Sequence, residues 1–185
     1  MDPDVQTDLI LRDELVFHLR VGDAHQTFEA AVADFPDEAI NVRAPHVSYT
    51  FWHLLEHVRF CQVDMLDYLR NPGYRAVTFP DDYWPPSTEI ASRQRWDDTL
   101  AAYRTDLGEV ETFVRDAGTD LFVAAPHAWQ PNHTPLRTVL VMADHAAYHG
   151  GEFGILRQVL GLWGTDRKDS FTDHASATQN LPDTS

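Results

Sequence analysis

Cysteine and basic residues are scarce in this sequence, and each scarcity excludes a class of protein. The 185 residues include a single cysteine, Cys61, which excludes a disulfide framework within the chain and a cysteine-cluster zinc site. Lys and Arg number 14 against 29 Asp and Glu, which gives a formal net charge of −15. With so few cations available to neutralise phosphates, we expect neither nucleic-acid binding nor docking on an anionic membrane.

Long apolar runs are also missing. No window approaches the roughly 20 consecutive apolar residues that span a bilayer, and the opening MDPDVQTDLI has neither the basic region nor the apolar stretch of an export signal. The hydrophobic fraction of 43% is that of an ordinary globular chain, and the length suits one domain. We therefore expect a soluble cytoplasmic protein with a single core.

Apolar residues recur at helical spacing in four long segments. The expected helices cover 4–35, 48–70, a segment that begins near Ser87 and ends at 116–118, and 134–163, the last announced by Thr134-Pro135. Long connections follow the second and third of them, and no segment alternates with the period of a strand. The pattern predicts an all-α fold, a four-helix bundle with long crossover connections over residues 1–163, followed by a polar C-terminal tail at 164–185.

Histidine is unusually abundant, with ten residues. His145 and His149 lie four residues apart in the middle of the apolar stripe of 134–163, so both imidazoles point the same way. Burying two neutral imidazoles without partners costs about 1–3 kcal/mol each. A metal ion inside the bundle would satisfy them. The alternative is a pair of core histidines that form hydrogen bonds with carbonyls or tyrosines.

A third ligand would have to come from another helix, and 48–70 offers two candidates. His57 lies about 60° from the centre of its apolar stripe and His53 about 100° away, so His57 is better placed to reach inward. A site that uses both of them is a competing geometry. Asp64, on the same side as His57, could orient an imidazole, while Glu152 could be a supporting carboxylate, a general base or a surface charge.

Glycine in the last helix is a further anomaly, because Gly150, Gly151 and Gly154 each cost about 1 kcal/mol relative to alanine. They project away from the histidines and make a flat surface that another helix or subunit could approach. Dimerisation and tight packing inside the bundle both explain them.

Two stretches, 48–72 and 141–163, resemble the DinB superfamily, also described as DinB/YfiT-like metalloenzymes. The motifs are one histidine in the second helix and a His-x-x-x-His followed by glycine in the fourth, and the order of elements agrees over 5–163. The resemblance implies a four-helix bundle, often dimeric, with a divalent metal held by His57, His145 and His149. Where many members have glutamine, this chain has Glu152.

The characterised members of that family include thiol-dependent transferases and isomerases. An anionic low-molecular-weight thiol would need positive groups near the metal, and the fourth helix offers only Arg137 and Arg157. We expect a metal-dependent enzyme, an S-transferase, isomerase or hydrolase, that acts on a small molecule as a homodimer, with Glu152 as a catalytic proton carrier. Zinc and nickel suit imidazole ligands, iron is a third candidate, and a low-molecular-weight thiol is a candidate co-substrate. The alternative is a non-catalytic, metal-stabilised or stress-related bundle that binds a protein partner.

Overall fold

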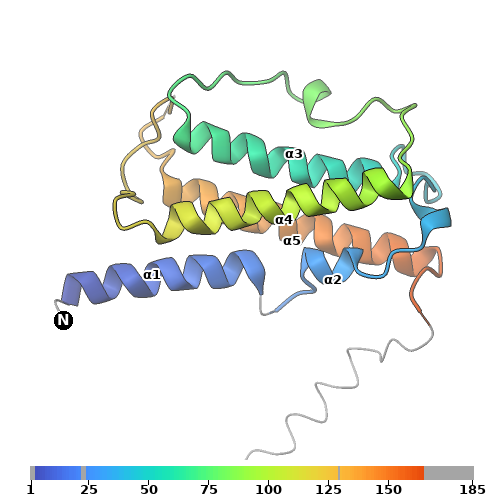
Figure 1. Cartoon of the computed structure of the whole chain (residues 1–185), viewed down its shortest axis with the longest axis horizontal. Helices are drawn as coiled ribbons and strands as arrows, with labels where there is room; N and C mark the ends of the chain where they lie inside the picture. The colour runs from blue at the N-terminus through green and yellow to red at the C-terminus, as the bar shows by residue number, and fades with distance from the viewer. Residues whose placement is uncertain (1–2, 22–23, 129, 165–185) are drawn as a thin grey trace, which may run out of the picture.

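The computed structural model describes residues 3–21, 24–128 and 130–164, and every regular element in these ranges is a helix. Its elements are α1 (Pro3–Arg20), α2 (Phe28–Val32), η1 (Asp37–Ala39), α3 (Phe51–Arg70), η2 (Asp81–Tyr83), α4 (Arg93–Arg115) and α5 (Pro135–Val159). In these three ranges there is no strand, which confirms the all-α prediction. The four long helices run along one another as a bundle (Figure 1). None of the helices in the described ranges has both the length and the apolar character needed to cross a membrane.

The contacts among the helices set their order in the bundle. α3 packs against α4 and α5, and α1 also packs against α4 and α5, so α4 and α5 lie diagonally across the bundle. The short α2 lies against α5. The connection between α3 and α4, residues 71–92, is called the crossover segment. It runs along the outside of α3 and includes η2 (Figure 1). As a result, the crossover segment covers the α3 side of the interface between α3 and α5.

The prediction of one helix over 4–35 is wrong. α1 ends at Arg20, and α2 is a separate helix whose first turn is capped by Thr27, whose side-chain oxygen accepts a hydrogen bond from Ala30 N. The sequence has Gly22 between them, and glycine is among the residues least suited to a helix interior. A side-chain cap five residues later then offers the chain a new start, and α2 takes a different direction from α1 (Figure 1).

Two other boundaries also differ from the prediction. α4 begins at Arg93, where Ser92 Oγ accepts a hydrogen bond from Arg95 N, and not near Ser87. α5 begins at Pro135 with Thr134 as its cap, as predicted, but it ends at Val159, four residues before Trp163. Apart from Gly164, the predicted polar tail lies outside the described residues.

The three glycines of α5 have different surroundings, and one of them lies against the backbone of another segment. A Cβ at Gly150 would lie 3.4 Å from Phe28 Cα, and one at Gly154 would lie 2.7 Å from Gln26 Oε1. At Gly151 the same atom would meet nothing within 4 Å. Close approach of the backbone that enters α2 therefore explains Gly150, whereas the contact at Gly154 is with the end of a flexible side chain and the dimer explanation stays open for Gly151 and Gly154.

The core has an aromatic half and an aliphatic half. Phe35, Trp96 and Phe153 belong to the aromatic cluster near α2, with the rings of Phe35 and Trp96 stacked at 4.7 Å. The other cluster, which includes Val139 and Met142, is almost wholly aliphatic. Because His145 and His149 stand between Met142 and Phe153 on α5, the histidines lie where the two halves of the core meet.

Candidate metal centre

Three imidazoles meet between α3 and α5. The helices bring one ring nitrogen from each of His57, His145 and His149 within 4.8 Å of one another. The ring centroids are 5.1 Å apart for His57 and His145, 4.9 Å for His57 and His149, and 4.5 Å for His145 and His149. Three nitrogen donors with a shared focus match the ligand set of a catalytic zinc site, which keeps another position open.

Burial keeps these imidazoles in the form that binds metal. It lowers the pKa of His149 to about 3 and that of His145 to about 4, with the neighbouring imidazoles as a second cause. The pKa of His57 is lowered by the same burial. At neutral pH all three rings are therefore uncharged, and their nitrogen lone pairs are free for a cation.

Hydrogen bonds at the back of two rings aim the opposite nitrogen at the centre. His149 Nδ1 lies 2.7 Å from Glu152 Oε2, and His57 Nδ1 lies 2.9 Å from the carbonyl oxygen of Tyr83. A carboxylate and a carbonyl can only accept, so each Nδ1 carries the proton and each Nε2 is left as the metal-facing atom. The other oxygen of Glu152 accepts a hydrogen bond from the Tyr49 hydroxyl. Glu152 is therefore in contact with a candidate ligand.

Aromatic side chains form the wall beside His57. The Trp84 ring stacks on the His57 ring with centroids 3.9 Å apart and an interplanar angle of 4°, and Tyr49 lies 5.1 Å from Trp84 on the centroid measure. Sequence reasoning missed both residues as parts of the site. The signal available was the aromatic richness of the crossover segment, but a connection without a helical period gives no register from which to place a ring.

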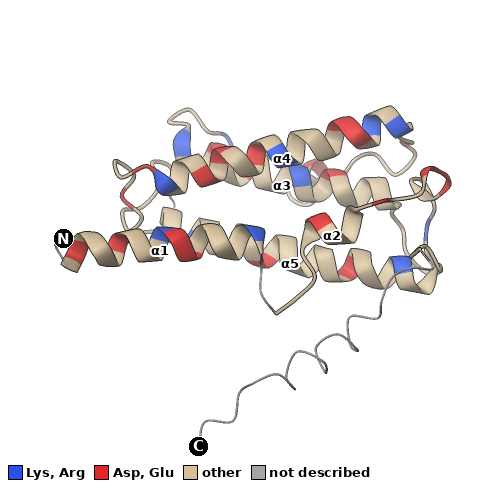
Figure 2. Cartoon of the chain, turned by 60° about the horizontal axis from the view of Figure 1, so that its bottom comes forward, with Lys and Arg blue, Asp and Glu red and all other residues tan. Residues whose placement is uncertain are grey.

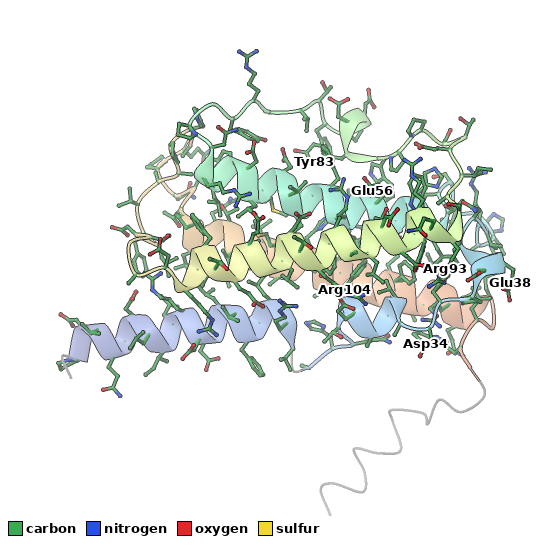
Figure 3. The ribbon with its side chains drawn as sticks, viewed as in Figure 1. Asp34, Glu38, Glu56, Tyr83, Arg93 and Arg104 are labelled. Atoms are coloured by element: carbon green, nitrogen blue, oxygen red, sulfur yellow. The ribbon has the colours of Figure 1, made fainter. Side chains whose placement is uncertain are left out.

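Asp64 fixes the crossover segment and does not touch an imidazole. Its two carboxylate oxygens accept hydrogen bonds from the hydroxyls of Tyr74 (3.0 Å) and Tyr83 (2.9 Å). The side chain of Tyr83 extends from the crossover segment toward α3 (Figure 3). Because the Tyr83 carbonyl accepts from His57, Asp64 supports that imidazole through the backbone of the crossover.

His53 stands outside this centre. It is buried, but Nδ1 lies 2.6 Å from Thr50 Oγ1 and Nε2 lies 3.0 Å from the carbonyl oxygen of Pro86. Both ring nitrogens are therefore occupied, and the competing geometry, in which His53 and His57 share one site, is not the one observed. The helical wheel placed His53 on a flank; the crossover segment covers that flank and buries the ring.

The lone cysteine and the two arginines of α5 take no part in the histidine cluster. Cys61 Sγ lies 3.6 Å from His57 Nδ1, and burial raises the pKa of its thiol to about 12, so Cys61 is a protonated core residue at neutral pH. Arg157 is buried and donates to the carbonyls of Ala31 and Ala33 at 2.8 and 2.7 Å. Of the two arginines that the fourth helix was found to offer to an anionic thiol, only Arg137 is exposed.

Comparison with known proteins identifies the family. No curated protein matches the chain. Residues 21–153 match the DinB superfamily, a range that covers more than half of the chain and contains His57, His145 and His149. The helical architecture and the histidine cluster agree with that match, and the chain belongs to the DinB superfamily.

Proposed function

We propose that this protein is a divalent-metal-dependent enzyme that acts on a small molecule, with His57, His145 and His149 as the metal ligands. The observation that carries the proposal is the convergence of three neutral imidazoles from two helices, two of them buried and one, His145, half-buried. Membership of a superfamily whose domains are often metal-binding supports it. Zinc and nickel are the metals that this all-nitrogen donor set favours, and iron is the third candidate.

The protein's own residues prepare the centre for catalysis. A divalent ion held there would lower the pKa of a coordinated water or thiol toward neutrality, which provides a nucleophile for transfer or hydrolysis. Glu152 and the Tyr83 carbonyl fix the orientation of two ligands, and Trp84 keeps water from one face of His57. Glu152 can also accept a proton, since burial raises the pKa of its carboxyl group.

Elemental analysis of the purified protein tests the metal site directly. We expect close to one equivalent of a divalent metal per chain, and a His145→Ala variant with the same helical content and little bound metal. A folded wild-type protein that takes up no zinc, nickel or iron when each is supplied would overturn the proposal.

A scaffold role is the second candidate, and one observation favours it. The outer face of α5 exposes large apolar side chains that could contact another protein, namely Leu140, Val141, Tyr148, Ile155 and Val159. If chelation unfolds the bundle and no thiol or hydrolysable substrate is turned over, the metal is structural. If chelation leaves the helices intact but abolishes turnover, the enzyme proposal gains.

The homodimer, the cytoplasmic location and a thiol co-substrate stay predictions. Light scattering that gives a molar mass twice that of one chain would confirm the dimer. Turnover that requires an added low-molecular-weight thiol would confirm the co-substrate.

A further inference from the structure

One side chain contacts the residues that lie behind two of the candidate ligands. Tyr49 precedes the cap of α3, so it belongs to neither of the helices that carry the imidazoles, and it is half-buried. Its hydroxyl donates to Glu152 Oε1, and its ring centroid lies 5.1 Å from that of Trp84. Glu152 forms a hydrogen bond with His149 of α5. Trp84 stacks on His57 of α3. Tyr49 therefore touches one supporting residue of a ligand on each helix.

The Tyr49 hydroxyl restricts the position of Glu152. α5 has two acidic residues, and Figure 2 shows acidic positions in the middle of this helix and a basic position nearer its C-terminal end. Among the described residues, Glu152 forms hydrogen bonds only with Tyr49 and His149, and no Lys or Arg pairs with it. A glutamate side chain has several rotamers, and a hydrogen bond at Oε1 favours the one in which Oε2 reaches His149 Nδ1. Without the hydroxyl, Oε1 would lose its one protein donor.

The Tyr49 ring restricts the position of Trp84. The two rings are tilted by 32°, and their separation is within the range of favourable aromatic pairs. Trp84 belongs to the crossover segment and follows η2, so the contacts of its ring help to fix where this part of the chain lies. The nearly parallel stack of Trp84 on His57 carries this restriction to the imidazole.

We propose that Tyr49 is a positioning residue of the metal centre and acts on ligands of both helices. Through Glu152 it orients His149, and through Trp84 it orients the ligand of α3. The inference rests on the proposed function, in which these imidazoles hold the metal. A site whose ligands are already held in the binding geometry gives up less free energy to order them, so it binds the metal more tightly.

Removal of the hydroxyl alone tests the path through Glu152. Tyr49→Phe keeps the ring, and we expect its affinity for cobalt(II) to fall about ten-fold, as is typical when the partner behind a metal ligand is disturbed. Competition with a chromophoric chelator measures the affinity, and the visible absorption of bound cobalt reports a change in ligand geometry. Tyr103→Phe is the matched control, since Tyr103 is buried in the aromatic cluster on α4, and it should leave both measurements unchanged.

A double-mutant cycle shows whether the hydroxyl acts through Glu152. In a Glu152→Ala protein the carboxylate is absent, so the addition of Tyr49→Phe should change the cobalt affinity less than about two-fold. Tyr49→Leu removes the ring as well as the hydroxyl, and we expect a further loss of about three-fold beyond Tyr49→Phe, because the contact with Trp84 is also lost. Circular dichroism of the metal-free variants checks that the helical content is retained.

The outcomes separate this inference from the proposed function. Cobalt affinity and absorption that Tyr49→Phe leaves unchanged would overturn the inference, and so would an equal loss with and without Glu152. Equal affinities of Tyr49→Phe and Tyr49→Leu would overturn the path through Trp84. Each of these results leaves the metal site itself intact. A wild-type protein that takes up no divalent metal would overturn the proposed function, and the inference with it.

Discussion

Two histidine pairs with the same four-residue spacing lie on neighbouring helices and behave differently. On α5, His145 and His149 turn their rings to one point, with centroids 4.5 Å apart. On α3, His57 joins that point while His53 does not. Equal spacing places two side chains on one helix face, but the partners that each nitrogen meets decide whether the ring is available to a ligand.

The different position of His53 in its helix explains the contrast. His53 is the third residue of α3, and it forms a reciprocal capping arrangement with Thr50, in which its own backbone N–H is also bound. Its remaining nitrogen holds the crossover segment at Pro86. His57, one turn later, lies beyond the cap and faces α5. Within α3, the first histidine serves the architecture and the second is left for the metal.

Removal of His149, one of the three candidate ligands, should have the largest effect on metal binding. In His149→Ala, one of three ligands is lost, so we expect metal affinity to fall by about 100-fold or more and the bound metal to drop well below stoichiometric. His53→Ala, the matched variant, should retain its metal. Elemental analysis after gel filtration measures both. If His53→Ala also lost its metal, the division of roles between the two pairs would be wrong.

Removal of the His53 ring should lower the stability of the fold and not the metal affinity. His53→Ala removes two hydrogen bonds from a buried ring and leaves the Pro86 carbonyl without that donor, so the free energy of unfolding of the metal-free protein should fall by about 2 kcal/mol. Urea denaturation followed by circular dichroism measures it. A fall of less than about 0.5 kcal/mol would show that the cap and the crossover do not depend on this ring.

The α5 pair should also make the stability of the metal-free protein depend on pH. Burial holds the pKa values of His145 and His149 at about 4 and about 3, below their ordinary value of 6.5. Between the lowered pKa of each histidine and pH 6.5, the unfolded chain therefore binds more protons than the folded one. The free energy of unfolding therefore falls as pH drops from about 6.5 toward 4. His145→Ala should reduce that slope by up to about 1.4 kcal/mol per pH unit. Equal slopes in both proteins would contradict this reasoning.

The smallest effect is expected from the residue that supports His57 indirectly. Asp64→Asn can accept from only one of the two tyrosines, which loosens the crossover and the Tyr83 carbonyl behind His57. Metal affinity should fall about five-fold, less than the loss typical of a direct partner of a ligand. A competition titration with a chromophoric chelator measures it. Asp67→Asn, one turn further along α3, is the control and should leave the affinity unchanged.

Prediction from the sequence worked best within a single helix. His145 and His149 could be paired because a constant period fixes their directions, and His57 could be selected over His53 from its angle to the apolar stripe. The break between α1 and α2 was missed, since the apolar period continues through Gly22 and only the cap at Thr27 starts a new helix. The crossover residues Tyr83 and Trp84 have no period and could not be placed.

The amino-acid sequence by itself determined the helical class, the inward direction of His145 and His149, and the acidic character of the chain, because each depends on local periodicity or composition. The same periodicity favoured His57 over His53, and only the tertiary structure decided that the His57 ring meets the two rings of α5, that His53 holds the crossover, and that Glu152 and Trp84 support the imidazoles. These roles depend on the relative position of helices and of a connection far apart in the chain, which side-chain packing sets and local spacing does not.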